Sequence, residues 1–168
     1  MTAAPIIVTA RLGDADFAWL DEQRSAYFPA ERNQLRAHLT MFHHLPPSIE
    51  RELMTALKDE ARDPAPRARL AGLINLGGGV AYRIDSDDLA AIRARLADRF
   101  AGCLTPQDAA GWREHVTIQN KVPPAEARKL LATLEAEFQP RPLAITGLSA
   151  YWYRGGPWEA IGSVRFRG

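Results

Sequence analysis

The sequence contains a single cysteine, Cys103, among 168 residues. One thiol cannot build a disulfide framework or a cysteine-based metal site. No apolar run reaches the roughly 20 residues that a membrane-spanning helix needs. Residues 1–10 lack the charged start and apolar core of a signal peptide, and Ile6–Leu12 is instead typical of a buried strand. We therefore expect a reducing, cytoplasmic compartment and no membrane partner.

A large excess of either charge is also missing, because 21 basic residues face 20 acidic ones and the formal net charge is +1. Proteins that coat nucleic acid without sequence preference need a strong basic excess. We therefore expect no such coat and no DNA partner, although a local anion site is compatible with this balance. Eighteen of the basic residues are Arg, which prefers bidentate phosphate or carboxylate contacts. Genomic base composition explains that number at least as well.

One short motif occurs twice. Arg36-Ala37-His38-Leu39-Thr40 is followed 77 residues later by Arg113-Glu114-His115-Val116-Thr117. Aligned without a gap, residues 36–60 and 113–137 share nine identities in 25 positions, whereas unrelated segments would share roughly one or two. The identical pairs are Arg36/Arg113, His38/His115, Thr40/Thr117, Pro46/Pro123, Pro47/Pro124, Arg51/Arg128, Leu53/Leu130, Leu57/Leu134 and Glu60/Glu137. This similarity predicts an internal duplication.

The hydrophobic pattern repeats with the motif and predicts an α+β chain of two strand–helix–strand–helix–strand halves. The first half, about 1–79, has expected strands at 6–12, 38–42 and 69–76 and helices at 14–28 and after Pro46-Pro47. A glycine hairpin at 77–79 leads into the second half, about 80–168. Its expected strands are 80–85, the second His-x-Thr segment and 143–153, its helices begin near Asp87 and Pro123-Pro124, and 158–166 is a closing strand. No linker separates the halves, so we expect one bilobal domain, 1–168, with pseudo-two-fold symmetry.

The alternation of a strand gives the repeated motif a reactive side. Residues i and i+2 share a face, so His38 lies beside Thr40 and His115 beside Thr117. Two facing imidazoles suit acid–base catalysis, since one can accept a proton while the other donates one near neutral pH. Threonine hydroxyls can hold phosphate oxygens. We expect His38 and His115 to be catalytic and Thr40 and Thr117 to bind phosphate, in a site without metal.

Other side chains near the motifs are candidate substrate contacts. Arg36 and Arg113 would offset phosphate charge if the strands extend that far. Phe42, which shares the expected face of His38 and Thr40, could stack on a base. Further aromatic candidates flank the second glycine turn, although core packing is the simpler explanation for each of them: Tyr151, Trp152, Tyr153 and Trp158.

The paired segments His38-Leu39-Thr40-Met41 and His115-Val116-Thr117-Ile118 resemble the two-histidine phosphoesterase superfamily, particularly its 2'-5' RNA ligase-like and RNA 2',3'-cyclic phosphodiesterase branch. The resemblance covers nearly the whole chain. It implies a bilobal fold with antiparallel sheets lining a central groove and helices outside. It also implies hydrolysis of a 2',3'-cyclic phosphate of a nucleotide or RNA end to a 2'-phosphate, without a cofactor. On that analogy His115 activates water and His38 protonates the leaving 3'-oxygen.

Two departures from the family pattern leave the substrate open. Many members have Pro before the second His, where this chain has Glu114, and many have a basic residue at the position of Asn120. Ligation of RNA halves through a 2'-5' bond, and nucleotide or RNA binding without catalysis, stay as alternatives. His43 and His44 are interpreted as solvated loop histidines, because their spacing is not that of a zinc site. A monomer is expected.

Overall fold

The computed structural model describes residues 4–168, which form two four-stranded antiparallel sheets with helices around them. The first sheet has the order β2-β1-β7-β8 and the second has the order β5-β4-β3-β6. The strands are β1 (Ile6–Leu12), β2 (Leu39–Leu45), β3 (Ala68–Asn75), β4 (Val80–Asp85), β5 (His115–Gln119), β6 (Arg141–Leu143), β7 (Ile145–Trp152) and β8 (Glu159–Arg165). The helices are α1 (Asp14–Tyr27), α2 (Glu50–Glu60), α3 (Asp87–Arg99), α4 (Pro106–Ala109) and α5 (Pro124–Glu137). The expected α+β architecture with two duplicated halves is confirmed.

The two halves exchange strands. β3, from the first half, pairs with β4 through the hairpin at Gly77–Gly79. β7, from the second half, pairs with β1. Each sheet is thus built from both halves, and the strands that carry the repeated motif, β2 and β5, form an edge of each sheet. The hairpin needs glycine, because a Cβ at Gly79 would overlap the Gln119 carbonyl oxygen.

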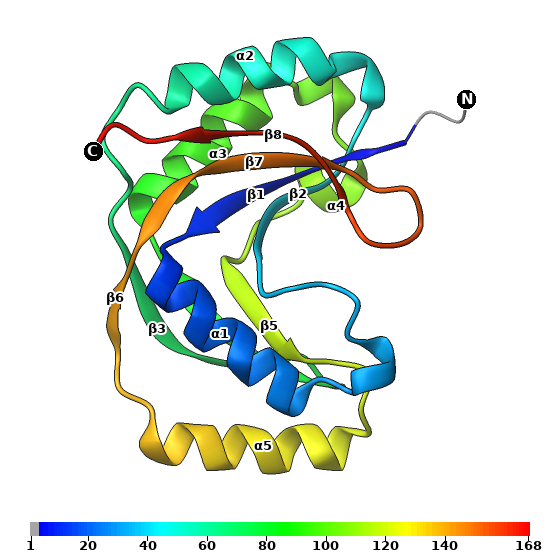
Figure 1. Cartoon of the computed structure of the whole chain (residues 1–168), viewed down its shortest axis with the longest axis vertical. Helices are drawn as coiled ribbons and strands as arrows, with labels where there is room; N and C mark the ends of the chain where they lie inside the picture. Colours follow the sequence, from blue (N-terminus) through cyan, green and yellow to red (C-terminus); the bar gives the residue numbers. More distant parts are fainter. Residues whose placement is uncertain (1–3) are drawn as a thin grey trace.

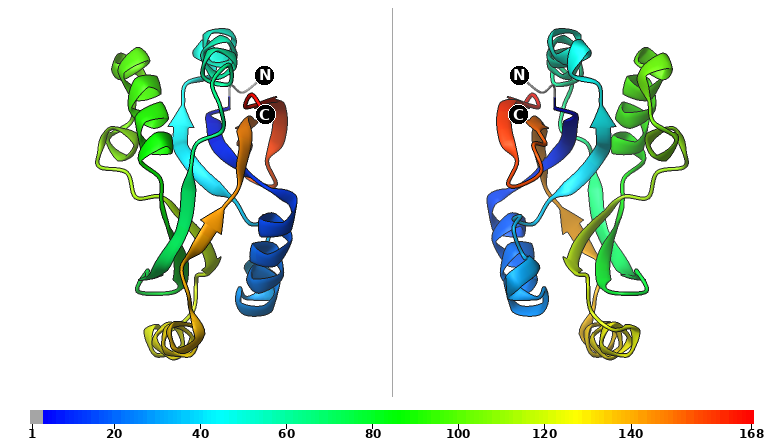
Figure 2. Two further views of the ribbon diagram at one scale, coloured as in Figure 1. Left: turned by 90° about the vertical axis from the view of Figure 1, so that its left-hand side faces the viewer. Right: turned by 90° about the vertical axis from the view of Figure 1, so that its right-hand side faces the viewer.

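The helices pack on the sheets through their apolar faces. α2 packs against β8 and buries Leu53, Ala56 and Leu57, a stripe at helical spacing. α1 packs beside β5, and α5 packs against β3 and β4. Figure 1 shows α2 and α3 beside the first sheet, α5 at the far end beneath the second, and α1 between them, and Figure 2 shows the same arrangement from both sides.

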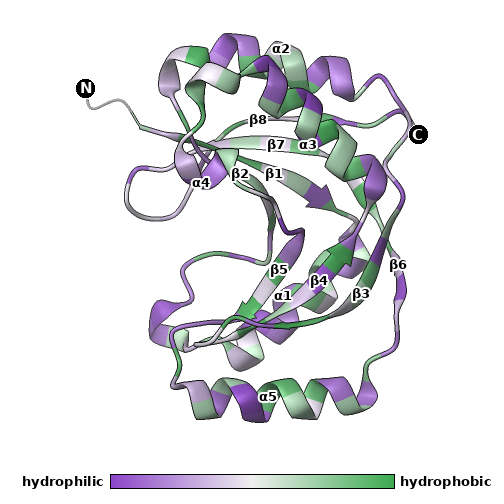
Figure 3. Cartoon of the chain, turned by 180° about the vertical axis from the view of Figure 1, so that it is seen from behind, coloured by the Kyte–Doolittle hydropathy of each residue, from purple (hydrophilic) through white to green (hydrophobic). Residues whose placement is uncertain are grey.

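One hydrophobic core runs through both sheets. It includes Val8 of β1, Leu39 of β2, Ile84 of β4, Val116 of β5 and Leu148 of β7, all at most 2% exposed. Figure 3 shows hydrophilic and hydrophobic residues alternating along α2 and α5. No helix among residues 4–168 combines the length and apolarity needed to cross a membrane.

Candidate active site

The two His-x-Thr segments lie on neighbouring edge strands at the centre of the molecule, where β2 and β5 contact each other (Figure 1). His38 immediately precedes β2, and His115 is the first residue of β5. The apolar side of each strand lies where the alternation predicts it, because the four residues expected on that side are all buried: Leu39, Met41, Val116 and Ile118. Thr40 and Thr117 are only partly buried. The structure thus brings the predicted reactive sides of both motifs together.

Both histidines are held by the same local hydrogen bond. The Nδ1 atom of His38 lies 2.7 Å from the carbonyl oxygen of Arg36, and that of His115 lies 2.7 Å from the carbonyl oxygen of Arg113. A carbonyl oxygen can only accept, so each Nδ1 carries a proton and donates it. This fixes the tautomer and leaves each Nε2 free. The duplication has therefore preserved both the residues and the ring orientation that proton transfer through Nε2 requires.

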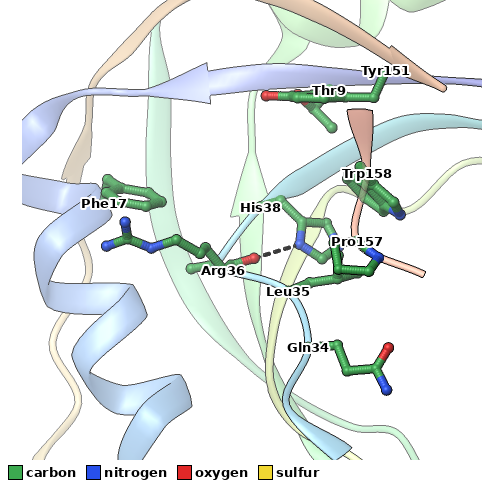
Figure 4. A pocket seen from close by; sticks show the side chains of 10 residues that line it. Thr9, Phe17, Gln34, Leu35, Arg36, His38, Tyr151, Pro157 and Trp158 are labelled. Atoms are coloured by element: carbon green, nitrogen blue, oxygen red, sulfur yellow. Dashed lines mark hydrogen bonds between the residues drawn. The ribbon is translucent and has the colours of Figure 1, made fainter. Parts of the chain in front are cut away.

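A cavity of about 370 Å³ opens beside His38. Figure 4 shows the ring of Trp158 next to His38, with Tyr151 and Thr9 above and Phe17 of α1 at the other side. The ring centroids of His38 and Trp158 are 4.7 Å apart, and those of Trp158 and Tyr151 are 5.5 Å apart. His38 thus faces an aromatic cavity that lies between α1 and the first sheet.

The surroundings of His38 disfavour its charged form. Burial lowers the pKa of His38 from 6.5 to about 4, and the bond to the Arg36 carbonyl only partly offsets this effect. The charges of Arg24, His115 and His43 lower that pKa further. His38 is therefore neutral at neutral pH, with a lone pair on Nε2.

Each motif strand carries a β-bulge directly after its threonine. Along β2, Thr40 pairs with Thr9 but Phe42 pairs with the adjacent Val8, so Met41 is the extra residue. Along β5, Thr117 pairs with Ala81 and Gln119 with Val80, so Ile118 is the extra residue. The duplication thus extends to this irregularity of the backbone.

The bulge corrects the prediction for Phe42. Paired residues of neighbouring strands share a face, so Phe42 lies on the core face with Val8, opposite Thr9 and Thr40. Phe42 is 1% exposed, and the guanidinium of Arg93 lies 4.5 Å from its ring centroid. Its ring cannot stack on a substrate, because the extra residue reverses the simple i, i+2 alternation.

Two buried arginines bind the backbone at these bulges, and each comes from the helix that follows the first strand of the other half. Arg93 of α3 donates from Nε to the Met41 carbonyl at 2.9 Å. Arg24 of α1 donates from Nη1 to the Thr117 carbonyl at 3.2 Å. Carbonyls at an edge or a bulge lack a ladder partner, and these contacts supply one. Sequence reasoning missed both arginines, although Arg24 follows Leu20, and Arg93 follows Leu89, at the spacing of a buried helix face.

His43 and His44 are not loop residues as expected, because both belong to β2. Their backbone N–H groups donate to the carboxylate of Asp108, each at 2.9 Å, and the Nδ1 atom of His43 lies 3.3 Å from the same carboxylate. Burial alone raises the pKa of Asp108, but the hydrogen bonds from His43 and His44 outweigh it and leave that pKa below its usual range. Within residues 4–168, no group of three or more His, Cys, Asp or Glu side chains is arranged as a metal site.

The two predicted arginine contacts differ in their surroundings. Arg36 lines the His38 cavity, forms an ion pair with Asp21 at 3.0 Å and lies 4.8 Å over the ring of Phe17. Its side chain is 73% exposed, so the ion pair itself contributes little to stability. Arg113 is exposed next to the second motif. Both arginines can therefore reach an anion without leaving a buried position.

Glu114, which directly precedes His115, is a half-buried carboxylate. Its Oε2 accepts a hydrogen bond from the Ser86 N–H at 3.0 Å, and its buried Oε1 has no partner among residues 4–168. Burial raises the pKa of Glu114 to about 7, with smaller increases from Asp85 and Asp87 and an opposing effect of the Ser86 hydrogen bond. The chain therefore holds a carboxylate that titrates near neutral pH directly before His115.

Replacing this carboxylate by an amide, Glu114→Gln, is expected to stabilise the protein above neutral pH. Because the folded-state pKa is raised, the folded state binds more protons than the unfolded state between the ordinary value of 4.5 and about 7, and stability falls as pH rises through that range. One pKa unit corresponds to about 1.4 kcal/mol, and partial solvent contact reduces the effect, so we expect a gain of about 1–2 kcal/mol at pH 8. Urea unfolding at pH 8 and pH 4.5 measures it.

The matched control is Glu126→Gln, which removes an exposed carboxylate and should change the free energy of unfolding little at either pH. A Glu114→Gln protein that is no more stable than the parent at pH 8 would contradict the raised pKa.

The family model of the 2'-5' RNA ligase superfamily matches residues 12–157. That match covers most of the sequence, and the two His-x-Thr segments lie within it. The chain belongs to the 2'-5' RNA ligase superfamily, a group of two-histidine phosphoesterases.

Solved structures share this fold. LigT from E. coli complexed with 3'-AMP has a TM-score of 0.65 at 16% identity, covering 99% of this chain and 100% of that one. TT0787 from Thermus thermophilus has a TM-score of 0.63 at 16% identity and covers 98% of both chains. A structure described as a phosphoesterase has a TM-score of 0.61 at 16% identity, covering 98% of this chain and 99% of the other. No curated protein matches the sequence. Such low identities establish the fold alone.

Proposed function

We propose that the protein is a metal-independent phosphoesterase that hydrolyses the 2',3'-cyclic phosphate of a nucleotide or RNA end to a 2'-phosphate. One observation carries this proposal. Two histidines at equivalent positions of adjoining edge strands are both anchored through Nδ1, which leaves two Nε2 atoms for proton transfer.

The reaction needs one proton acceptor and one proton donor. Water attacks phosphorus in line with the P–O3' bond, one imidazole accepts the proton of the water, and the other protonates O3' as it leaves. Each of these transfers typically contributes about 10²–10⁴ to the rate. The hydroxyls of Thr40 and Thr117 donate to the non-bridging phosphate oxygens, and Arg36 and Arg113 offset the phosphate charge from the rim.

A nucleotide fits the surroundings of the two histidines. Trp158 and Tyr151 offer aromatic surface within the cavity beside His38, and bases stack on such surfaces whatever their identity. Among proteins of the same fold, LigT has been crystallised with 3'-AMP and with NADP+. Both facts support a nucleotide or an RNA end as the substrate.

The direct test is incubation with the four 2',3'-cyclic nucleotides and with an oligoribonucleotide that ends in a 2',3'-cyclic phosphate, in the presence of a chelator. We expect ring opening to the 2'-phosphate in each productive case. Failure to open any of these substrates would contradict the proposal.

Ligation is the second candidate, because the matching family model is that of the 2'-5' RNA ligases. In that reaction a 5'-hydroxyl takes the place of water, its oxygen bonds to phosphorus as the P–O3' bond breaks, and the same two imidazoles transfer the protons. An assay with one RNA ending in a cyclic phosphate and another beginning with a 5'-hydroxyl separates the two reactions. Joined product would establish ligation, whereas only opened cyclic phosphate would leave hydrolysis as the activity.

Removing either threonine hydroxyl is expected to weaken catalysis without changing the fold. Valine keeps the β-branched shape of threonine, so Thr40→Val and Thr117→Val delete only a donor to the phosphate. A hydrogen bond to a charged group is worth about 1.5–3 kcal/mol, which corresponds to a loss of roughly 10–100-fold in kcat/KM. Steady-state kinetics on a 2',3'-cyclic nucleotide measures this loss.

Thr133→Val is the control, because the hydroxyl of Thr133 bonds the Lys129 carbonyl within α5. It should leave kcat/KM unchanged. Values within twofold of the parent for both motif variants would rule out phosphate binding by these hydroxyls.

A further inference from the structure

A row of hydroxyl groups crosses the first sheet from β2 to β8. Thr40 of β2 pairs with Thr9 of β1, and Thr9 pairs with Ser149 of β7. Ser149 pairs in turn with Ser163 of β8, and the two serine hydroxyl oxygens are 2.7 Å apart. Paired residues of neighbouring strands share a face. The polar side of the first motif therefore continues across the whole sheet.

Two arginines lie next to this row on the same face. Arg11 follows Thr9 by two residues on β1, and Arg165 follows Ser163 by two residues on β8. Gly147 of β7 pairs with both arginines and places no side chain between them. Neighbouring strands are about 4.8 Å apart, so the backbones of the two arginines are roughly 10 Å apart. That spacing suits two successive anionic groups better than one.

Both of these arginines are exposed, and among residues 4–168 neither forms an ion pair. Two carboxylates beside the ends of the strands already have partners. Asp16 of α1 accepts the Ala144 N–H at 2.8 Å and pairs with Arg141 at 3.7 Å. Glu159 of β8 pairs with Arg154 at 2.7 Å. The two guanidinium groups on this face can therefore bind phosphate in bidentate geometry.

The same face continues into the cavity beside His38. Thr9 of the hydroxyl row lines that cavity together with Trp158 (Figure 4). The other face of the sheet is covered, because α2 packs against β8 from the core side, where Met54 lies over Gly162 (Figure 1). A nucleic-acid strand that leaves the cavity along the first sheet therefore meets the two arginines.

We propose that this face of the first sheet, from Thr9 to Arg165, binds the RNA strand on the 5' side of the cyclic phosphate. Arg11 and Arg165 contact the phosphates that precede the terminal nucleotide, and the hydroxyl row is the polar floor beneath the strand. This inference rests on the proposed cyclic phosphodiesterase activity and selects its substrate, an RNA end rather than a free cyclic nucleotide. Contacts to phosphates carry no sequence information, so the strand binds whatever its bases are.

The dependence of kcat/KM on chain length tests this proposal. A 2',3'-cyclic nucleotide offers no further phosphate, whereas a trinucleotide that ends in a 2',3'-cyclic phosphate offers two. Hydrogen bonds to a charged group favour the trinucleotide, and we expect its kcat/KM to be roughly 10–100-fold higher in the parent protein. The double variant Arg11→Gln with Arg165→Gln should lose this advantage and keep the parental kcat/KM for the cyclic nucleotide.

The matched control is Arg51→Gln with Arg128→Gln, which removes two exposed arginines from α2 and α5 and changes the net charge equally. It should keep the advantage of the trinucleotide. Equal kcat/KM for the two substrates in the parent protein would overturn the proposal without any variant. An equal loss on both substrates in the double variant Arg11→Gln with Arg165→Gln would also overturn it, because the arginines would then serve the terminal nucleotide.

Binding of RNA can be measured without turnover. The probe is a fluorescent trinucleotide that ends in a 3'-phosphate, followed by anisotropy at several salt concentrations. Each phosphate contact on a single strand contributes about 0.7 to the slope of log Kd against log salt, so the double variant Arg11→Gln with Arg165→Gln should lower that slope by about 1.4. An unchanged slope would overturn the proposal. No turnover of any cyclic phosphate by the parent would instead overturn the proposed function, while the slope still decides whether this face binds RNA.

Discussion

Replacing either motif histidine by alanine, His38→Ala or His115→Ala, is expected to lower kcat/KM for a 2',3'-cyclic nucleotide by about 10²–10⁴-fold. Each substitution removes one of the two Nε2 atoms that transfer protons. Both histidines lie at the edge of a sheet and are only partly buried, so the fold should persist, which circular dichroism can verify. The double variant should lose less than the product of the two single losses, because groups that act together are not additive.

His44→Ala is the matched control for these variants. His44 lies on β2 with an exposed side chain, and its backbone N–H donates to Asp108. Its removal should leave kcat/KM within a few fold of the parent. If both motif variants retained parental activity, the two-histidine mechanism would be excluded whatever the substrate.

The largest loss of stability is expected from Asp108→Ala. The Asp108 carboxylate is buried and accepts the backbone N–H groups of His43 and His44 at the end of β2. Leaving buried donors without an acceptor costs about 1–3 kcal/mol each, so we expect the free energy of unfolding to fall by about 2–4 kcal/mol. Urea unfolding measures this loss, with Asp98→Ala on the exposed side of α3 as the control. A loss below about 0.5 kcal/mol, the range of ordinary surface changes, would contradict this role.

The contact between Asp108 and the backbone of β2 also predicts how the stability difference between the parent and Asp108→Ala depends on pH. The folded-state pKa of Asp108 is depressed below 3.8, so its contribution to stability is present above the unfolded value and is lost as pH falls through the folded value. The difference between the parent and Asp108→Ala should therefore shrink in acid. A difference that stays constant down to the lowest pH at which the protein folds would show that packing, rather than the ionised carboxylate, is responsible.

The repeat carried most of what could be predicted from the sequence. Nine identities around His38 and His115 identified equivalent strands, and the helix and strand patterns on either side gave the element order. The Gly77–Gly79 hairpin also predicted that β3 pairs with β4. These features are local, because they depend on periodicity and turn chemistry within a few residues.

What the sequence did not reveal depends on contacts between distant residues. The extra residue at Met41 places Phe42 on the core face, and the sequence of such a short strand does not indicate the bulge. His43 meets Asp108 across 65 positions, and Arg24 meets Thr117 across 93. The role of an arginine on an apolar helix face cannot be predicted until its partner is known. Such a side chain can also lie along the apolar face and extend its guanidinium to solvent.

Phosphorus-31 NMR of one reaction, 2',3'-cyclic AMP in water enriched in oxygen-18, tests the central claim most directly. We predict a single new monoester, 2'-AMP, whose phosphate carries one heavy oxygen from the attacking water, and no product in the double variant His38→Ala with His115→Ala. Intact substrate in the parent reaction, or the same product at the same rate in the double variant, would contradict the two-histidine mechanism.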